Sequence, residues 1–320
     1  MWKVILRRLL LMIPQLFALS VLVFILAKFM PGDPFTGMIT PETDPARIEE
    51  LREEAGLNDH WHEQYVRWIV NALHGDFGKS YTFQRDVSDL IGERALNTFW
   101  LSFLSVILLY VIAIPLGVLA GRYQNSRLDK TIVLYSFISY AIPTFVLSLL
   151  FLYLFSYTLD WFPTSGSVDI QYEEGSFAYY WSKFYHLVLP AITYAVLGTT
   201  GIIQYLRSEI IDAKSMDYVR TARSKGIPMR RVYTKHIIRN SLLPIAAFFG
   251  FTITGLLGGS IFIETIFGYP GMGQLFISSI TSRDYSVITA LVMLFGFLTL
   301  LGSLLSDIIM SIVDPRIRIE

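Results

Sequence analysis

Six stretches of the sequence are apolar over about 20 residues, the length that a helix needs to cross the hydrocarbon core of a membrane. They cover residues 9–30, 98–121, 131–157, 187–206, 242–263 and 287–309. Because the bilayer core offers no water to unpaired backbone groups, such stretches cross it as helices. The sequence therefore predicts an all-α polytopic membrane protein with six transmembrane helices.

Charged residues make up only 16% of the chain, whereas a soluble domain usually carries about 25%. They also divide unevenly between the segments that join the apolar stretches. Segments on one side hold 17 of the 26 basic residues and seven of the 26 acidic ones, and the opposite side holds nine basic and 19 acidic residues. Because loops rich in Lys and Arg stay in the cytoplasm, we expect both termini and the segment after the fourth stretch to be cytoplasmic.

The first external segment, residues 31–97, is too long to be a simple connection. Asp44-Pro45 favours the start of one helix, aromatic and apolar residues recur at helical spacing over 61–73, and a third helix near Val87 leads into the second apolar stretch. The expected organisation is an N-terminal tail with the first transmembrane helix (1–30), an extracellular helical loop (31–97) and a five-helix core (98–320).

The segment at about 208–241 is the most basic part of the chain. Asp217 is suited to cap a helix, and Gly226 followed by Pro228 marks the end of that helix. Three apolar side chains fall on one of its faces: Tyr218, Val219 and Ala222. The pattern predicts a helix, a glycine turn and a second helix, which together are compact enough to be presented to another protein. The second helix carries basic residues every fourth position on one face: Arg231, Lys235 and Arg239.

Ala222, a gap of three residues, Gly226 and a later Leu243-Pro244 resemble the cytoplasmic coupling loop of ABC-importer permeases. Arg220 and Thr221 stand where that loop usually has Glu and Ala, which resembles the oligopeptide, dipeptide and nickel branch, in particular permeases of the oligopeptide B type. Three further motifs match the same branch: MPGDPF at 30–35, GDFGKSY at 75–81 and DPRIR at 314–318.

The resemblance implies a subunit that imports oligopeptides across the bacterial cell membrane and forms half of the pathway. Its implied partners are a homologous second permease, two cytoplasmic ATPases that bind ATP and Mg, and an external solute-binding protein; the chain itself holds no cofactor. The residues implied in ATPase coupling are Tyr218, Val219, Arg220, Thr221, Ala222, Arg223 and Gly226. We expect Tyr218, Val219 and Ala222 to face the ATPase, with Arg220 and Arg223 at the rim. A structured external mouth is expected from Glu264, Gly268, Pro270, Gly271 and Gly273.

Other function classes fit the sequence less well. Cysteine is absent, no catalytic constellation occurs, and His60 and His62 lack the carboxylates that would complete a metal site. Gly78-Lys79-Ser80 resembles the end of a phosphate-binding loop, but Leu73 replaces its first glycine. The interiors of the apolar stretches carry no acidic or basic side chain, which argues against an ion-coupled secondary transporter. A nickel or other small-solute permease stays open, as do the secondary transporter and a membrane tether for nucleic acid.

Close helix contacts are expected where glycines are spaced by four. Gly117 and Gly121 form such a pair in the second apolar stretch, and Gly255 and Gly259 form another in the fifth.

Overall fold

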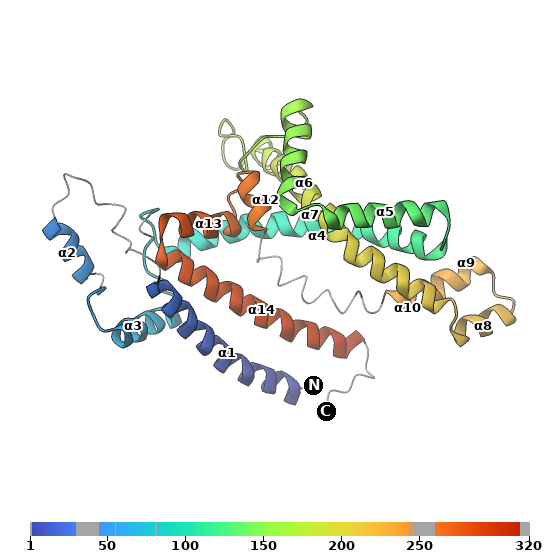
Figure 1. Cartoon of the computed structure of the whole chain (residues 1–320), viewed down its shortest axis with the longest axis horizontal. Coiled ribbons are helices and arrows are strands. Elements are labelled where there is room, and N and C mark those ends of the chain that lie inside the picture. Colours follow the sequence, from blue (N-terminus) through green and yellow to red (C-terminus); the bar gives the residue numbers. More distant parts are fainter. Residues whose placement is uncertain are drawn as a thin grey trace.

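The computed structural model describes residues 2–29, 45–54, 56–80, 82–242, 245 and 260–313 (Figure 1). Within these ranges the chain is helical and contains no β-strand. Four long helices dominate: α1 (Trp2–Phe29), α4 (Val87–Arg122), α7 (Phe177–Ala213) and α14 (Tyr285–Val313). The shorter helices are α2 (Pro45–Glu54), α3 (Trp61–Leu73), α5 (Arg127–Ala141), α6 (Thr144–Phe151), η2 (Leu152–Thr158), α8 (Asp217–Ser224), α9 (Met229–Val232), η3 (Tyr233–Ile238), α10 (Arg239–Ser241), α12 (Ile261–Ile266) and α13 (Met272–Ser282).

Helices α4 and α7 form the most extensive pair of the structure. Their backbones approach closely at Gly117 and Gly121, as the spacing predicts. A Cβ atom on Gly121 would lie 2.8 Å from Cβ of Ile210, and one on Gly117 would lie 3.0 Å from Cβ of Leu206. Small residues permit this approach, which favours helix association inside a membrane. The second glycine pair, at 255 and 259, falls outside the described residues.

Helices α1 and α14 lie side by side, with the start of α1 next to the end of α14 (Figure 1). Arg8 near the start of α1 forms a 2.7 Å ion pair with Asp307 near the end of α14. A Cβ atom on Gly296 would overlap the side chain of Leu19, so the helices also touch closely at mid-length.

The third apolar stretch, 131–157, is sharply bent at Pro143, a position where the sequence indicates a kink or a helix end. α5 ends at Ala141, α6 begins at Thr144, and the two parts meet at an angle of 103°. Pro143 lies at this break. Proline interrupts a helix because it has no backbone N–H to donate and its ring clashes with the preceding turn. By length and apolar character, four described helices could cross a membrane, or five if the bent pair is one span. The predicted stretch 242–263 falls mostly outside the described residues.

The segment before α4 makes two separate contacts, one with α1 and one with the junction of α13 and α14. In α3, the hydroxyl of Tyr65 lies 2.8 Å from that of Ser20 on α1, and its ring meets Phe24 edge-on at 5.4 Å. The expected third external helix and the second apolar stretch form one helix, because α4 begins at Val87. Ser80 is buried and donates a 2.5 Å hydrogen bond to the buried Asp284, between α13 and α14. The Gly78-Lys79-Ser80 motif thus anchors a loop.

Candidate coupling surface and external mouth

Helix α8 follows directly after α7 and has a well-defined C-terminal end. Gly226 adopts φ +71°, the left-handed conformation that the sequence predicts. Its N–H donates to the carbonyl of Arg223 at 2.9 Å, and the N–H of Ile227 donates to the carbonyl of Ala222 at 3.3 Å. These two bonds form a Schellman motif, which satisfies carbonyl groups that the helix end would leave free. At the other end, Met216 is the N-cap and Asp217 is the first helical residue, contrary to the expected cap at Asp217.

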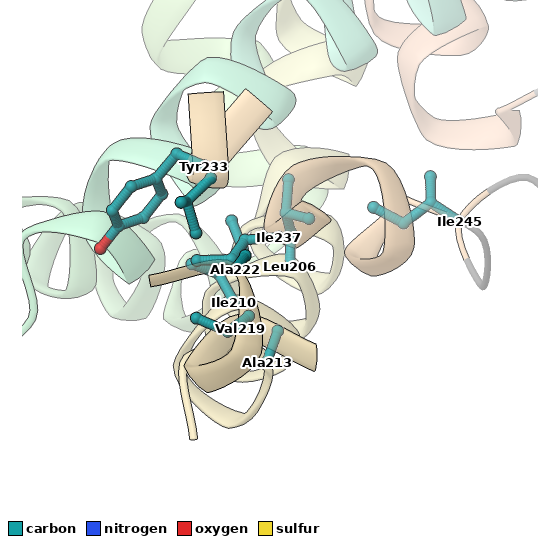
Figure 2. Close-up of a cluster of buried hydrophobic side chains, with 9 residues drawn as sticks. Leu206, Ile210, Ala213, Val219, Ala222, Tyr233, Ile237 and Ile245 are labelled. Carbon is teal, nitrogen blue, oxygen red and sulfur yellow. The ribbon is translucent and has the colours of Figure 1, made fainter. Parts of the chain in front are cut away.

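The apolar face of α8 is turned toward the chain itself. Val219 is fully buried and Ala222 is 5% exposed. They belong to one hydrophobic cluster with residues of α7 and of the segment after Gly226, drawn in Figure 2: Leu206, Ile210, Ala213, Val232, Tyr233, Ile237 and Ile245. The expectation that Val219 and Ala222 face an ATPase is therefore wrong. Apolar side chains at i and i+3 on so short a helix bury against the nearest apolar partner, which is the end of α7.

The opposite face of α8 is free for contact with another protein among the described residues. Tyr218 is 38% exposed, and the side chain of Arg220 is 73% exposed. Thr221 and Arg223 are exposed as well. The Thr221 hydroxyl donates to the carbonyl of Asp217 at 2.9 Å, so it stays close to the helix surface. This face is polar, with two cations and one aromatic ring.

An ion pair between the half-buried Arg207 and the buried Asp129 ties α7 to the corner between α4 and α5. The guanidinium of Arg207 donates to both oxygens of Asp129 at 2.7 and 2.9 Å. The N–H of Asn125 donates to the same carboxylate at 2.8 Å. Lys214, the residue after α7, donates to the carbonyls of Gly121 and Arg122 at the end of α4. Breaking one partner of such a buried pair is strongly destabilising, because it strands the other charge.

Sequence reasoning missed these partners. Asp129 and Arg207 are 78 positions apart, and the only available signal is that each lies at the boundary of an apolar stretch.

At the other end of α4, Glu264 of helix α12 is completely buried beside the turn that leads to α13. One carboxylate oxygen accepts from the Thr98 hydroxyl at 3.0 Å, and the other accepts from the N–H groups of Gly273 and Gln274 at 2.6 and 3.0 Å. The carboxylate therefore occupies the N-terminus of α13, where the helix dipole favours a negative charge. Burial raises the pKa of Glu264, and the hydrogen bonds that it accepts act in the opposite direction.

The glycines of this turn make room for that carboxylate. A Cβ atom on Gly271 would lie 2.5 Å from Glu264, and one on Gly273 would lie 2.9 Å from it. Gly268 has φ +56°, and the carbonyl of Pro270 accepts a 2.9 Å hydrogen bond from Asn97 on α4. The five residues predicted for the external mouth thus lie close together, in α12, the following turn and the start of α13, and this unit is held against α4.

Neither cluster brings together groups suited to bond-breaking chemistry. Over the described residues, no set of three or more His, Asp or Glu side chains is arranged to hold a metal ion. What these clusters provide is attachment: α8 is held on α7, α7 is held on the corner between α4 and α5, and the α12–α13 turn is held on α4.

Comparison with known proteins gives a consistent result along the whole chain. Residues 113–319 match the family described as binding-protein-dependent transport system inner membrane component. Residues 1–102 match the N-terminal region of the membrane components of the same transport systems.

Two curated relatives cover nearly the full length. The chain is 41% identical to the oligopeptide transport system permease protein AppB of Bacillus subtilis, over 98% of both chains. It is 34% identical to the glutathione transport system permease protein GsiC of Escherichia coli K12, over 99% of both chains.

The fold is also similar to that of a solved structure. A chain of the MetNI methionine ABC transporter, in an inward-facing conformation, aligns with a TM-score of 0.55 at 17% identity, covering 70% of this chain and 96% of that one. With the full-length matches above, this chain is a multi-pass bacterial membrane protein that belongs to the binding-protein-dependent transport system inner membrane components, as an ABC-importer permease of the branch that resembles oligopeptide permeases of the B type.

Proposed function

We propose that this chain is one of two homologous membrane subunits of an ATP-driven importer of oligopeptides. The carrying observation is the 41% identity with an oligopeptide permease over 98% of both chains. The relative named for glutathione, itself a small peptide, supports the same substrate class. In this proposal two cytoplasmic ATPases bind ATP and Mg, an external binding protein delivers the peptide, and this chain carries out no catalysis.

The proposed topology has six spans and two cytoplasmic termini. Four long apolar helices and the bent α5–α6 pair supply five of these spans. The sixth corresponds to the apolar stretch 242–263. The Arg8–Asp307 ion pair supports placing both termini on one side, because it joins the first turns of α1 to the last turns of α14.

The exposed face of α8 is the proposed contact with the ATPases, while Val219 and Ala222 attach the helix to the permease core. Replacing Arg220 by glutamate is expected to reduce ATPase co-purification without affecting membrane insertion. Lys183→Glu is the matched control, since it makes the same charge change near the opposite end of α7. Equal ATPase recovery from both variants would contradict the assignment.

The substrate proposal is tested with the complete transporter in liposomes, including its second permease, ATPases and binding protein. Labelled pentapeptide should accumulate only with hydrolysable ATP, and an ionophore that dissipates ion gradients should leave uptake unchanged. ATP-driven accumulation of Ni²⁺ without peptide would favour the small-solute alternative. Peptide uptake driven by an ion gradient without ATP would instead establish a secondary transporter.

A further inference from the structure

The segment after the glycine turn has a second exposed surface, separate from that of α8. Arg231, Lys235 and Arg239 are all exposed, while Val232 and Ile237 of the same segment are fully buried. Among the described residues, none of the three cations forms an ion pair with a carboxylate. We call the surface formed by Arg231, Lys235 and Arg239 the basic face.

Two contacts place the basic face near the ends of the membrane spans. Helices η3 and α10, which carry Lys235 and Arg239, pack against α7, and Ile237 of η3 shares a buried cluster with Leu206, the last residue of the apolar stretch 187–206. Arg122, the first charged residue after the apolar stretch 98–121, lies over the ring of Tyr233 at 5.0 Å from its centroid. The segment therefore lies level with the ends of two spans, and Arg122 adds a fourth cation there.

The chain direction supports the same position. Arg239 belongs to α10, which packs against α7 and is followed by the apolar stretch that starts at Leu242. Clusters of Lys and Arg directly beside a membrane span attract anionic lipid headgroups, and the attraction falls off within a Debye length. From these contacts we infer that the basic face binds the headgroups of anionic phospholipids, with Arg122 beside them.

The cations of α8 lie farther from the membrane. α8 begins after α7 ends at Ala213, seven residues beyond Leu206, and seven residues of helix extend about 10 Å. In Figure 1, α8 and α9 lie past the end of α7, whereas α10, which carries Arg239, is set back along it. At physiological salt the Debye length is about 8 Å, so the α8 cations are largely screened from the lipid surface. They are exposed cations of the same loop and thus a matched control: Arg220, Arg223 and Lys225.

The experiment uses the assembled transporter and counts retained phosphatidylglycerol and phosphatidylcholine by native mass spectrometry. The variant Arg231→Gln/Lys235→Gln/Arg239→Gln should retain phosphatidylglycerol at least tenfold less than the wild type, with phosphatidylcholine unchanged. Each cation near an anionic surface contributes about 1 kcal/mol, which is about fivefold in affinity for the lipid. Lys235→Gln alone should therefore reduce phosphatidylglycerol retention by about fivefold. The control Arg220→Gln/Arg223→Gln/Lys225→Gln should retain wild-type phosphatidylglycerol levels per copy of this chain. Because Arg220 and Arg223 lie on the proposed ATPase contact, the lipid is counted on this chain whether or not the ATPases stay bound.

Folding is checked by comparing the Tm of both triple variants with that of the wild type in lipid-free detergent. If the basic-face triple variant does not fold, Lys235→Gln serves as the test. Raising NaCl to about 0.5 M should reduce phosphatidylglycerol retention by the wild type, because salt screens the attraction. Unchanged retention in the basic-face variants would overturn the inference. Loss of ATPase subunits with unchanged lipid retention would also overturn it, and would identify the surface as a protein contact. These outcomes do not depend on which solute is transported.

Discussion

Replacing Gly226 by alanine tests whether the turn after α8 holds the coupling helix in place. Gly226 has φ +71°, and a Cβ atom there would meet nothing within 4 Å. The cost of alanine is therefore conformational rather than steric, roughly 1–2 kcal/mol for a side chain in the left-handed region. A change of that size shifts the balance between native and alternative turns by about five- to 30-fold. α8 would then lose the fixed orientation that transmitting a movement from the ATPase requires.

The assay compares ATP hydrolysis stimulated by the binding protein, and peptide uptake, in liposomes that contain the assembled transporter. Gly226→Ala should insert normally and lose most of the stimulated hydrolysis. Gly226→Asn is the matched control, since asparagine tolerates the left-handed conformation, and it should retain more activity than the alanine variant. Wild-type uptake by Gly226→Ala would refute the reasoning. If asparagine is as damaging as alanine, the limit is space rather than φ, and the contact must come from outside the described residues.

The remaining predictions concern topology and packing. Reporter fusions after Arg127 should signal cytoplasm and fusions after Glu173 the exterior; a reversed result would overturn the proposed orientation. Gly121→Ala should destabilise the α4–α7 pair by about 1–3 kcal/mol through overpacking, lowering Tm, whereas Gly201→Ala, whose Cβ would meet nothing within 4 Å, should not. Glu264→Gln should lower Tm, because the amide of glutamine would turn an N–H group toward groups that themselves donate hydrogen bonds. Leaving a buried polar group unsatisfied costs about 1–3 kcal/mol. An unchanged Tm would show that the turn does not depend on this carboxylate.

Local signals in the sequence predicted local structure well. Gly226 ends α8 in the predicted left-handed conformation, and Gly117 and Gly121 mark a close helix contact. Both signals are intrinsic to glycine: it permits positive φ, and it lets another backbone or side chain approach. The density of glycine and proline in 264–275 correctly indicated a turn at Gly268, Pro270 and Gly271, but Glu264 and Gly273 lie in helices α12 and α13.

Features that depend on distant partners could not be predicted. The amphipathic pattern of α8 showed an apolar face but not which surface would cover it, and that surface proved to be the chain's own α7. Thr98 completes the site of Glu264 from a position 166 residues away, and nothing in its local sequence indicates that role. Pro143 indicated a kink or a helix end in the third apolar stretch, but a proline alone does not specify that the bend measures 103°.

Helix α8 has one face buried against the permease and one face exposed, and this separation affects how such transporters can be altered. Attachment to the permease and contact with the outside belong to different residues, because Val219 and Ala222 are buried while Tyr218, Arg220 and Thr221 are exposed. Exposed positions can therefore change together without disturbing the packing that holds the helix on α7. Transplanting the three exposed residues from a related permease offers a way to exchange one ATPase for another while the membrane core stays the same.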